Sequence, residues 1–303
     1  MIYTITLNPS IDYTVHLDSF TPGITNRTTK EEYHIGGKGI NVSCILSELG
    51  IKSRAIGFTA GFTGKAIEEE LEAKGIETDF IRLKEGISRI NIKLKAGEES
   101  EINCQGPHIN DKEFDMLLRK TDMISNGDTL VIAGSIPNTM PDNSYERILE
   151  RLKGRDVRIV IDAEKKLLVN SLKYKPFLIK PNKQELSEIF GTEITSDTVI
   201  EECAGKLKNM GAKNVIVSLG GSGAVLFDEN AHIYKSGVLN ERVISTVGSG
   251  DSMVAGFIAG YEKTNDYSYA FTLGTACGNA TAFSSGLATR EKIDEILSKL
   301  QSK

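Results

Sequence analysis

A glycine-rich turn leading into an apolar segment carries the residues with the clearest chemistry. Residues 246–256 read TVGSGDSMVAG, so Gly248, Ser249 and Gly250 directly precede Asp251. Glycines let a backbone turn tightly and approach a ligand, and a helix starting here would direct free N–H groups at an anion. A carboxylate beside such an anion hole is badly placed to bind phosphate but well placed to deprotonate a hydroxyl that attacks phosphate. The segment indicates phosphoryl transfer to an alcohol, and an ordinary capped helix start is the alternative.

A second glycine-rich turn lies near the amino terminus. Residues 36–42 read GGKGINV and place Gly37, Lys38 and Asn41 at the start of an expected helix. Such a turn can bring backbone N–H groups against a sugar hydroxyl or a phosphate, with the lysine as a point charge. The spacing differs from that of the loop G-x-x-x-x-G-K-[ST], and no G-x-G-x-x-G motif follows an early strand. Without a G-x-G-x-x-G motif, a Rossmann dehydrogenase is disfavoured. Binding of NAD would support that alternative again.

Two further groups of residues suit the binding of nucleotide phosphates. Asn182 and Glu185 lie three residues apart after an expected strand, so they share one helix face. Oxygen ligands at that spacing can hold hydrated Mg²⁺ between phosphates, and the same pair equally fits a helix cap. The sequence SLGGSG at 218–223 can pass close to phosphates and also fits a hairpin turn; its candidates are Ser218, Gly220, Gly221 and Gly223.

Apolar runs that favour strands alternate with helical patterns over most of the chain. The expected strands are 51–58, 129–133, 157–162, 177–180 and 214–219, with a hairpin over 215–227. The expected helices are 65–74, 111–124, 144–153, 182–190, 196–210, 253–261, 270–284 and 289–300. This alternation predicts a mostly parallel central sheet with helices on both faces, a three-layer α/β/α fold.

Two segments interrupt the alternation and predict a small separate sheet. Residues 11–35 and 88–105 contain period-2 stretches, such as RINIKL, that are typical of exposed antiparallel strands. We expect one domain over residues 1–303, with these segments forming a β lid that excludes water from a phosphoryl group. A decorative surface sheet is the alternative. Asp12, Arg89 and Asn103 lie in or near these strands, where a carboxylate suits sugar diols and an arginine suits phosphate, although each also fits a solvated surface.

The composition limits the classes of partner. A net charge of −5 over 303 residues argues against a nucleic-acid-binding surface, and no run approaches the roughly 20 apolar residues of a membrane helix. The first residues, MIYTITLN, predict a strand rather than a signal peptide, so we expect a cytoplasmic protein. The four cysteines are widely spaced and the four histidines form no metal-ligand motif, so we expect neither disulfides nor a zinc site.

Together these motifs resemble the PfkB, or ribokinase-like, family of carbohydrate kinases over essentially the whole chain. The resemblance includes GGKGIN at 36–41 and VGSGDS at 247–252, in the family's order and separation. TLNPSID at 6–12, RINIK at 89–93 and EIN at 101–103 are most similar to the branch that acts on hexose phosphates. Ser249 departs from the pattern, because many relatives carry alanine there; both residues are small, so we expect little effect.

The resemblance implies an ATP- and Mg²⁺-dependent kinase that phosphorylates the C6 hydroxyl of fructose 1-phosphate, with Asp251 as the general base. Phosphorylation of tagatose 6-phosphate at C1 is the alternative, fructose 6-phosphate stays open as a substrate, and a non-catalytic sugar-phosphate sensor on the same fold is the alternative from another class. The N–H groups of Gly248, Ser249 and Gly250 are implied to form the anion hole.

The resemblance also divides the remaining candidates between the ligands. Asn182 and Glu185 are implied to hold Mg²⁺ through water. The implied ATP-binding residues are Ser218, Gly220, Gly221, Gly223, Gly248, Ser249, Gly250, Gly278 and Asn279. The implied sugar-phosphate residues are Asp12, Arg27, Gly37, Lys38, Asn41, Arg89 and Asn103. In relatives the lid sheets of two subunits clasp each other, so a homodimer is implied by analogy.

Overall fold

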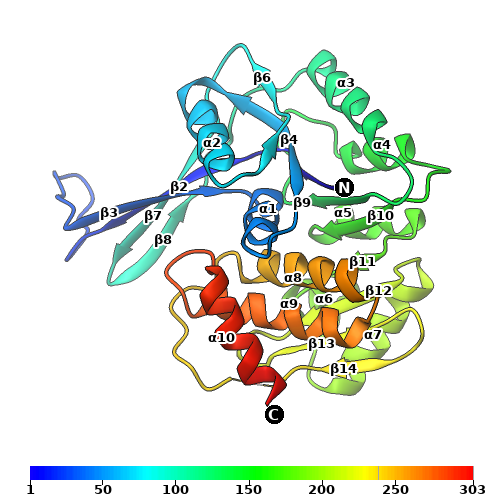
Figure 1. The fold of residues 1–303 in the computed structure, drawn as a ribbon. Coiled ribbons are helices and arrows are strands. Elements are labelled where there is room, and N and C mark those ends of the chain that lie inside the picture. Colours follow the sequence, from blue (N-terminus) through cyan, green and yellow to red (C-terminus); the bar gives the residue numbers. More distant parts are fainter. Residues whose placement is uncertain (238, 303) are drawn as a thin grey trace.

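Two β-sheets of unequal size organise the chain (Figure 1). The computed structural model describes residues 1–237 and 239–302. Within them, the larger sheet has the strand order β14-β13-β12-β11-β10-β9-β1-β4-β5, and β6 pairs with β4 outside this path. The pairs from β12 to β5 are parallel, whereas β13 and β14 add antiparallel strands at one edge. The strands are β1 Ile2–Thr6, β4 Ser53–Ala60, β5 Glu77–Thr78, β6 Ile81–Leu83, β9 Thr129–Ala133, β10 Arg158–Asp162, β11 Leu178–Ile179, β12 Asn214–Ser218, β13 Ala224–Phe227 and β14 Ile233–Lys235.

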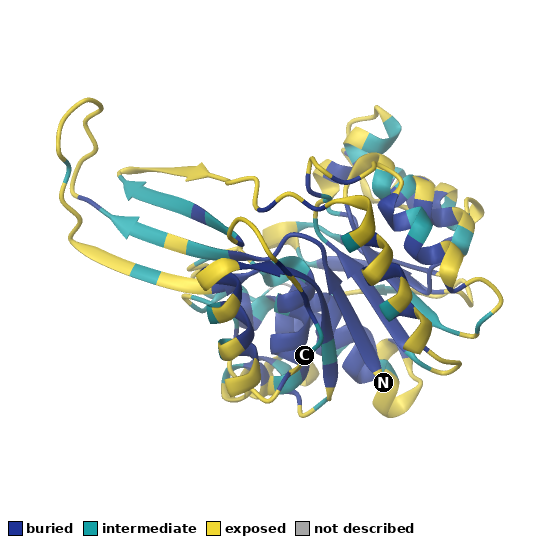
Figure 2. Cartoon of the chain, turned by 90° about the horizontal axis from the view of Figure 1, so that it is seen from above, coloured by how far each residue is buried: buried dark blue, intermediate teal, exposed yellow. Residues whose placement is uncertain are grey.

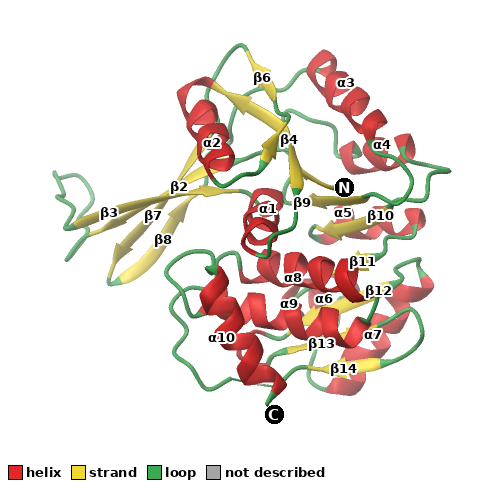
Figure 3. Cartoon of the chain, in the orientation of Figure 1, coloured by secondary structure: helices red, strands yellow, loops and turns green. Residues whose placement is uncertain are grey.

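Helices cover both faces of the larger sheet and produce three layers (Figure 3). One face carries α3 Asp111–Lys120, α4 Ser144–Arg151, α5 Lys165–Ser171, α6 Lys183–Phe190 and α7 Asp197–Asn209. The other carries α1 Lys38–Glu48, α8 Ser249–Thr264, α9 Tyr267–Ala282 and α10 Arg290–Gln301. Strand β1 is buried throughout, with Tyr3 and Ile5 in one apolar layer and Ile2 in the other, as expected for a parallel strand covered on both sides. The expected three-layer α/β/α fold is confirmed.

The smaller sheet extends from the body of the molecule (Figure 2). Its order is β3-β2-β7-β8, formed by β2 Ser10–His16, β3 Lys30–Gly36, β7 Arg89–Ala96 and β8 Glu98–Ile102. The pairs β2–β3 and β7–β8 are antiparallel hairpins, but β2 and β7 run parallel, so the expectation of antiparallel pairing is wrong at the centre of this sheet. The parallel pairing places Ser10 opposite Arg89, and both strands extend outward from the body of the molecule (Figure 1).

Most elements agree with the sequence analysis apart from their ends. Helix α8 begins at Ser249 rather than at residue 253, and β11 spans only Leu178–Ile179. Helix α3 ends at Lys120 and continues as a 3₁₀ turn, and α2, which covers Gly61–Ala73, starts four residues early. Helix α5 was not expected, because its seven residues contain too few buried positions to show a helical period. No helix of the described residues is both long and apolar enough to cross a bilayer.

Glycines bring α8 and α9 into close contact behind the site. A Cβ atom on Gly256 would lie 2.7 Å from the carbonyl oxygen of Leu273, and one on Gly274 would lie 2.8 Å from the carbonyl oxygen of Met253. A Cβ on Gly278 would lie 3.1 Å from the carbonyl oxygen of Ser249, the first residue of α8. Helix α9 therefore supports the amino-terminal turn of α8, where Asp251 lies.

Candidate active site

A cavity of about 450 Å³ lies where the carboxyl ends of parallel strands meet the amino terminus of α8 and the base of the smaller sheet. In open α/β sheets, this edge is the usual place for a ligand. Ten of the residues expected to bind ligands or catalyse the reaction line this one cavity, although they come from five separate stretches of the chain. They are Asp12, Gly37, Lys38, Asn41, Arg89, Asn182, Glu185, Gly248, Gly250 and Asp251.

Asp251 lies in the first turn of α8 and lines this cavity. Gly248 caps the helix with a left-handed backbone conformation, φ 77°, that favours glycine. The Asp251 side chain is buried, and its Oδ2 accepts a hydrogen bond of 2.7 Å from Nδ2 of Asn41 in α1. Burial and then the negative charge of Asp162 raise the pKa of Asp251 to about 7, against the opposing effects of Asn41 and two lysines. A carboxyl group with this pKa can accept a proton near neutral pH.

Asp162 is the most important site residue that the sequence analysis missed. It ends β10, is 2% exposed, and has Oδ1 at 3.4 Å from Nζ of Lys38 and 3.7 Å from Nζ of Lys180. Burial alone would raise the pKa of Asp162, but the charges of Lys180 and Lys38 outweigh it and lower the pKa. Its Oδ2 is buried without a hydrogen-bond partner in the described residues. One feature of the sequence could have identified Asp162. It is a charged residue at the carboxyl end of an apolar strand, and ligands usually bind at that edge of a parallel sheet.

Lys38 and Lys180 place positive charge beside the two aspartates. The pKa of Lys38 is raised, because the carboxylates of Asp162, Asp251 and Glu185 outweigh the effect of burial. Lys180 is 6% exposed and lies against Gly250, where an added Cβ would come within 2.9 Å of its Nζ. The glycine at 250 thus lets a lysine approach the start of α8, a second cation that the sequence analysis did not single out.

The amino terminus of α8 offers backbone N–H groups to an anion. The helical hydrogen-bond pattern begins with the N–H of Ser252, which donates to the carbonyl oxygen of Gly248 at 2.8 Å. The N–H groups of Gly250 and Asp251 precede this bond and have no helical acceptor. The N–H of Ser249 donates to the carbonyl oxygen of Thr246 at 3.3 Å, so it is less available than its neighbours for the expected anion hole.

Asn182 and Glu185 form a helix cap and also line the cavity. The N–H of Glu185 donates to Oδ1 of Asn182 at 2.8 Å, and the N–H of Asn182 donates to Oε2 of Glu185 at 2.7 Å. Burial raises the pKa of Glu185. The pair can therefore cap the helix and still present oxygen atoms to a hydrated Mg²⁺ in the cavity. Among the described residues no group of three or more His, Cys, Asp and Glu side chains could hold a metal ion.

Polar residues from β2 and β7 form the opposite end of the cavity. Oδ1 of Asp12 accepts hydrogen bonds of 2.8 Å from Ser10 and from Asn91. Nε of Arg89 donates to the carbonyl oxygen of Asn8 at 3.1 Å, and burial lowers the pKa of this arginine despite the nearby charge of Asp12. Ser10, Asn8 and Asn91 line the cavity as well. They were missed because short polar residues on alternating strands show no pattern of their own.

The remaining expected residues do not line the cavity. Ser249 is half-buried and Gly278 packs against α8, as described above. Asn103 and Arg27 are exposed, the first after β8 and the second in the loop between β2 and β3. The loop with Ser218, Gly220, Gly221 and Gly223 is a turn between β12 and β13, and Asn279 is half-buried in α9. This loop is nevertheless close to the site, since Ser218 forms an isolated parallel bridge with Asn182.

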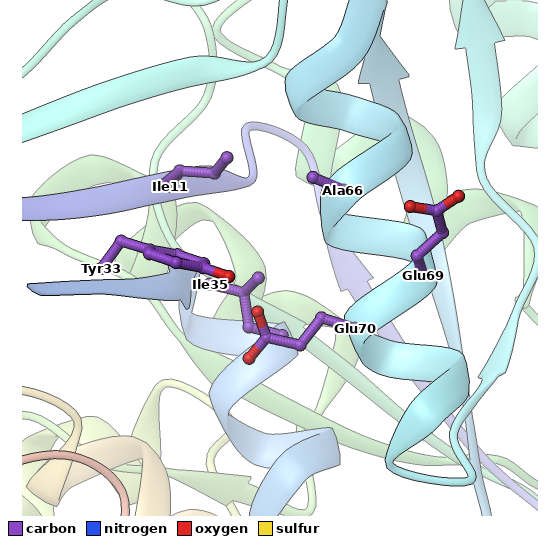
Figure 4. A pocket seen from close by; sticks show the side chains of 6 residues that line it. All are labelled: Ile11, Tyr33, Ile35, Ala66, Glu69 and Glu70. Carbon is purple, nitrogen blue, oxygen red and sulfur yellow. The ribbon is translucent and has the colours of Figure 1, made fainter.

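A wider hollow of about 590 Å³ lies away from these groups, between the outer face of the smaller sheet and α2 (Figure 4). Ile11, Tyr33 and Ile35 line its sheet side, and Ala66, Glu69 and Glu70 line its helix side. These residues provide apolar area, the exposed carboxylate of Glu69 and the half-buried carboxylate of Glu70, but no cation for a phosphate. Its position suits contact with another surface better than it suits catalysis.

Comparison with known proteins gives one consistent family. A family model described as pfkB family carbohydrate kinase matches residues 5–293. The chain is 45% identical over 301 residues to a 1-phosphofructokinase of Bacillus subtilis, and the match covers 99% of each chain. It is 37% identical over 302 residues to a D-tagatose-1-phosphate kinase of Bacillus licheniformis, again over 99% of both.

Solved structures agree with these relatives. Phosphofructokinase-2 from Escherichia coli, crystallised with substrates and products, superposes with a TM-score of 0.92 at 28% identity and covers 99% of each chain. Ribokinase from Arabidopsis thaliana superposes with a TM-score of 0.79 at 18% identity and covers 98% of each chain, which shows a shared fold.

Proposed function

This chain belongs to the pfkB family of carbohydrate kinases, and from that premise we propose that it transfers the γ-phosphoryl group of ATP to the C6 hydroxyl of fructose 1-phosphate. It is an ATP-dependent sugar-phosphate kinase, and the proposal concerns which sugar phosphate it uses and which residues act. The observation that carries the proposal is the buried Asp251 at the amino terminus of α8, in one cavity with two lysines and the polar groups of the smaller sheet.

Asp251 acts as the general base in this proposal. Its carboxylate accepts the proton of the C6 hydroxyl as that oxygen forms a bond to the γ-phosphorus, while the bond from the γ-phosphorus to the β,γ-bridging oxygen breaks and ADP leaves. A positioned base contributes about 10²–10⁴-fold to the rate. Lys38, Lys180 and the N–H groups at the start of α8 supply positive potential for the charge on the transferred group. The Asp251 hydrogen bond to Asn41 fixes the orientation of the base.

Mg²⁺ and ATP are assigned to the side of the cavity next to β11 and β12. Glu185 faces the cavity and commits one of its oxygens to the helix cap, which leaves the other for a water of a hydrated ion, and Asn182 lies beside it. Bound Mg²⁺ would neutralise phosphate charge there. We assign the turn Ser218–Gly223 to the ATP phosphates and Asn279 to the nucleotide, while Gly278 contributes by letting α9 support α8.

The sugar phosphate is assigned to the side of the cavity next to the smaller sheet. Asp12 binds sugar hydroxyls, and Arg89 binds the phosphate with help from Lys38, which also lies near Asp251. Arg27 and Asn103 are exposed, so they reach the substrate only when the smaller sheet closes over the cavity as a lid. We also propose that residues 1–303 form one kinase domain and that the smaller sheet is its lid.

The apolar outer face of the smaller sheet favours a homodimer. Paired positions on one face are apolar, because Tyr13 lies opposite both Tyr33 and Ile92, and Ile92 lies opposite Ile102. Tyr33 is 60% exposed and Ile102 is 57% exposed. Exposed apolar surface of this kind marks an interaction site, and the hollow beside α2 continues it (Figure 4). A second copy of the chain is the proposed occupant.

A coupled assay of ADP release tests the substrate. With Mg-ATP, kcat/KM for fructose 1-phosphate is expected to exceed that for tagatose 6-phosphate and fructose 6-phosphate by about 10²-fold or more, roughly 3 kcal/mol of transition-state binding. The value of kcat/KM for tagatose 1-phosphate is measured as well, since one relative is named D-tagatose-1-phosphate kinase. A preference for tagatose 6-phosphate would keep the base and the fold but reverse the sugar in the site. No turnover with any of them, despite binding, would favour a sensor.

A further inference from the structure

Asn91 connects two parts of the sugar end of the cavity through a single amide. It lies in β7 directly opposite Asp12 of β2, and it is 7% exposed. Its Nδ2 donates to Oδ1 of Asp12 at 2.8 Å, and its Oδ1 accepts from the N–H of Cys104 at 3.2 Å. Both polar ends of a buried side chain are thus committed, which fixes its rotamer and the groups that it contacts.

The first contact determines how Asp12 presents its carboxylate. Oδ1 of Asp12 accepts from both Ser10 and Asn91, whereas no hydrogen bond to Oδ2 is found within the described residues. Oδ2 lies against Gly36, where an added Cβ would come within 2.7 Å of it. Two donors on one oxygen hold the carboxylate plane in place and leave Oδ2 as the acceptor for a ligand hydroxyl.

The second contact attaches a segment that we call the strap, residues 103–107. The strap leaves the end of β8 and runs past Asn8, whose Nδ2 donates to the carbonyl oxygen of Gln105 at 2.9 Å. Gly106 has φ 87°, and an added Cβ there would lie 2.4 Å from Oδ1 of Asn8. The strap is therefore held by two asparagine amides, both belonging to residues that line the cavity.

We propose that Asn91 is a positioning residue that fixes Asp12 for recognition of a sugar hydroxyl and couples that carboxylate to the strap. The inference rests on the proposed function, because it takes a sugar phosphate as the ligand at this end of the cavity. Asn91 acts through Asp12 and contributes no group to the transferred phosphoryl. Its loss lowers the affinity for the sugar and leaves the affinity for ATP and the chemical step in place.

Variants at position 91 separate the two contacts. Asn91→Ala removes both, and it is expected to raise KM for the sugar phosphate about 10-fold, while KM for ATP and kcat change less than about threefold. Asn91→Asp keeps an acceptor for the N–H of Cys104 but replaces the donor to Asp12 with a second carboxylate, so its KM for the sugar is expected to rise at least as far. Wild-type behaviour of Asn91→Asp would show that the strap contact matters and the Asp12 contact does not.

A double-mutant cycle with Asp12→Asn provides the decisive comparison. If Asn91 acts through Asp12, Asn91→Ala causes little further increase in KM for the sugar when Asp12 is already replaced. The same increase in both backgrounds, or an equal rise in KM for ATP, would overturn the proposal. Asn126→Ala is the matched control, because Asn126 also accepts from a backbone N–H, that of Asp156, at the opposite edge of the sheet. It is expected to leave both KM values unchanged.

The substrate preference of the wild-type enzyme lets the test of Asn91 be judged separately from the proposed function. All variants are assayed with whichever sugar phosphate the wild type turns over best, so a different preferred sugar refutes the substrate assignment while the cycle still tests Asn91. Thermal unfolding identifies folded variants, and Asn91→Ser replaces Asn91→Ala if the latter does not fold. Its hydroxyl is too short to make both contacts, so the same rise in KM is expected.

Discussion

Two buried aspartates with opposite pKa shifts define the chemistry at the scale of single residues. Lys180 and Lys38 keep Asp162 ionised against the effect of burial, and its charge then adds to burial in raising the pKa of Asp251. Pairs of carboxyl groups whose surroundings separate their pKa values are typical of sites that move protons. In this arrangement Asp251 is the group that exchanges a proton near neutral pH, while Asp162 remains a fixed charge.

Replacing Asp162 is expected to change the pH dependence of the reaction. A base must be ionised to act, so wild-type kcat falls as the pH drops through about 7, the pKa of Asp251. Asp162→Asn removes a negative charge beside Asp251 and leaves Lys38 and Lys180 nearby, so the pKa of Asp251 falls and the acidic limb of the kcat profile shifts to lower pH. Profiles of kcat from pH 5 to 9 measure the shift. An unmoved limb would mean that the charge of Asp162 does not control the base.

The sequence predicted those site residues that sit in recognisable turns. Gly248, Gly250 and Asp251 share one turn, and Gly37, Lys38 and Asn41 share another, so local spacing alone brought each set together. Asp162, Lys180 and Asn91 were missed because each gains its role from a neighbour distant in the sequence. Lys38 and Asp162, for example, form their ion pair across 124 positions. Such partners follow from the order of the strands, which the local pattern does not determine.

At the scale of secondary structure, α9 packs closely against α8 and supports the turn that carries Asp251. Gly256, Gly274 and Gly278 let the two helix backbones approach, and Gly278 lies against the carbonyl oxygen of Ser249. Small residues at four-residue spacing favour this close contact between helices. The sequence showed both helices, but it did not show that their glycines face each other. The nucleotide-binding role that the resemblance implied for Gly278 stays a prediction beside this packing role.

Enlarging Gly256 is expected to destabilise this helix pair. Its added Cβ would lie 2.7 Å from a backbone oxygen of α9, which cannot move as a flexible side chain could, so Gly256→Ala should lower the free energy of unfolding by about 1–3 kcal/mol. Gly205→Ala in α7 is the control, because nothing lies within 4 Å of its added Cβ. There the same substitution should stabilise the protein by up to about 1 kcal/mol. Denaturant unfolding measures both, and equal effects would contradict the packing argument.

At the scale of the whole molecule, the smaller sheet has two chemically different faces. Asp12 and Asn91 lie on the face toward the cavity, whereas Tyr13, Tyr33 and Ile92 lie on the opposite face. The alternation along β2 and β7 predicted exposed strands from the sequence. The parallel pairing of these strands was not predicted, since strands far apart in the sequence leave no local signal of how they pair.

Charge placed on the apolar face is expected to disrupt the proposed dimer. Ile102→Lys introduces a cation where a second copy would bury apolar surface, so the protein should sediment as a monomer at concentrations where the wild type is dimeric. Glu99→Lys is the matched control, because alternation along β8 places residue 99 on the opposite face of the same strand. It should remain dimeric. Dissociation of both variants, or of neither, would argue against this face as the interface.

The most direct test of Asp251 as the base is the kcat of Asp251→Asn with Mg-ATP and the preferred sugar phosphate. The substitution keeps the size of the side chain, but its amide cannot accept a proton, so kcat should fall at least about 10²-fold while the dissociation constant of ATP stays nearly unchanged. Asn126→Ala is assayed in parallel and should retain full activity. A variant Asp251→Asn with near-normal kcat would show that Asp251 is not the base and that the central assignment is wrong.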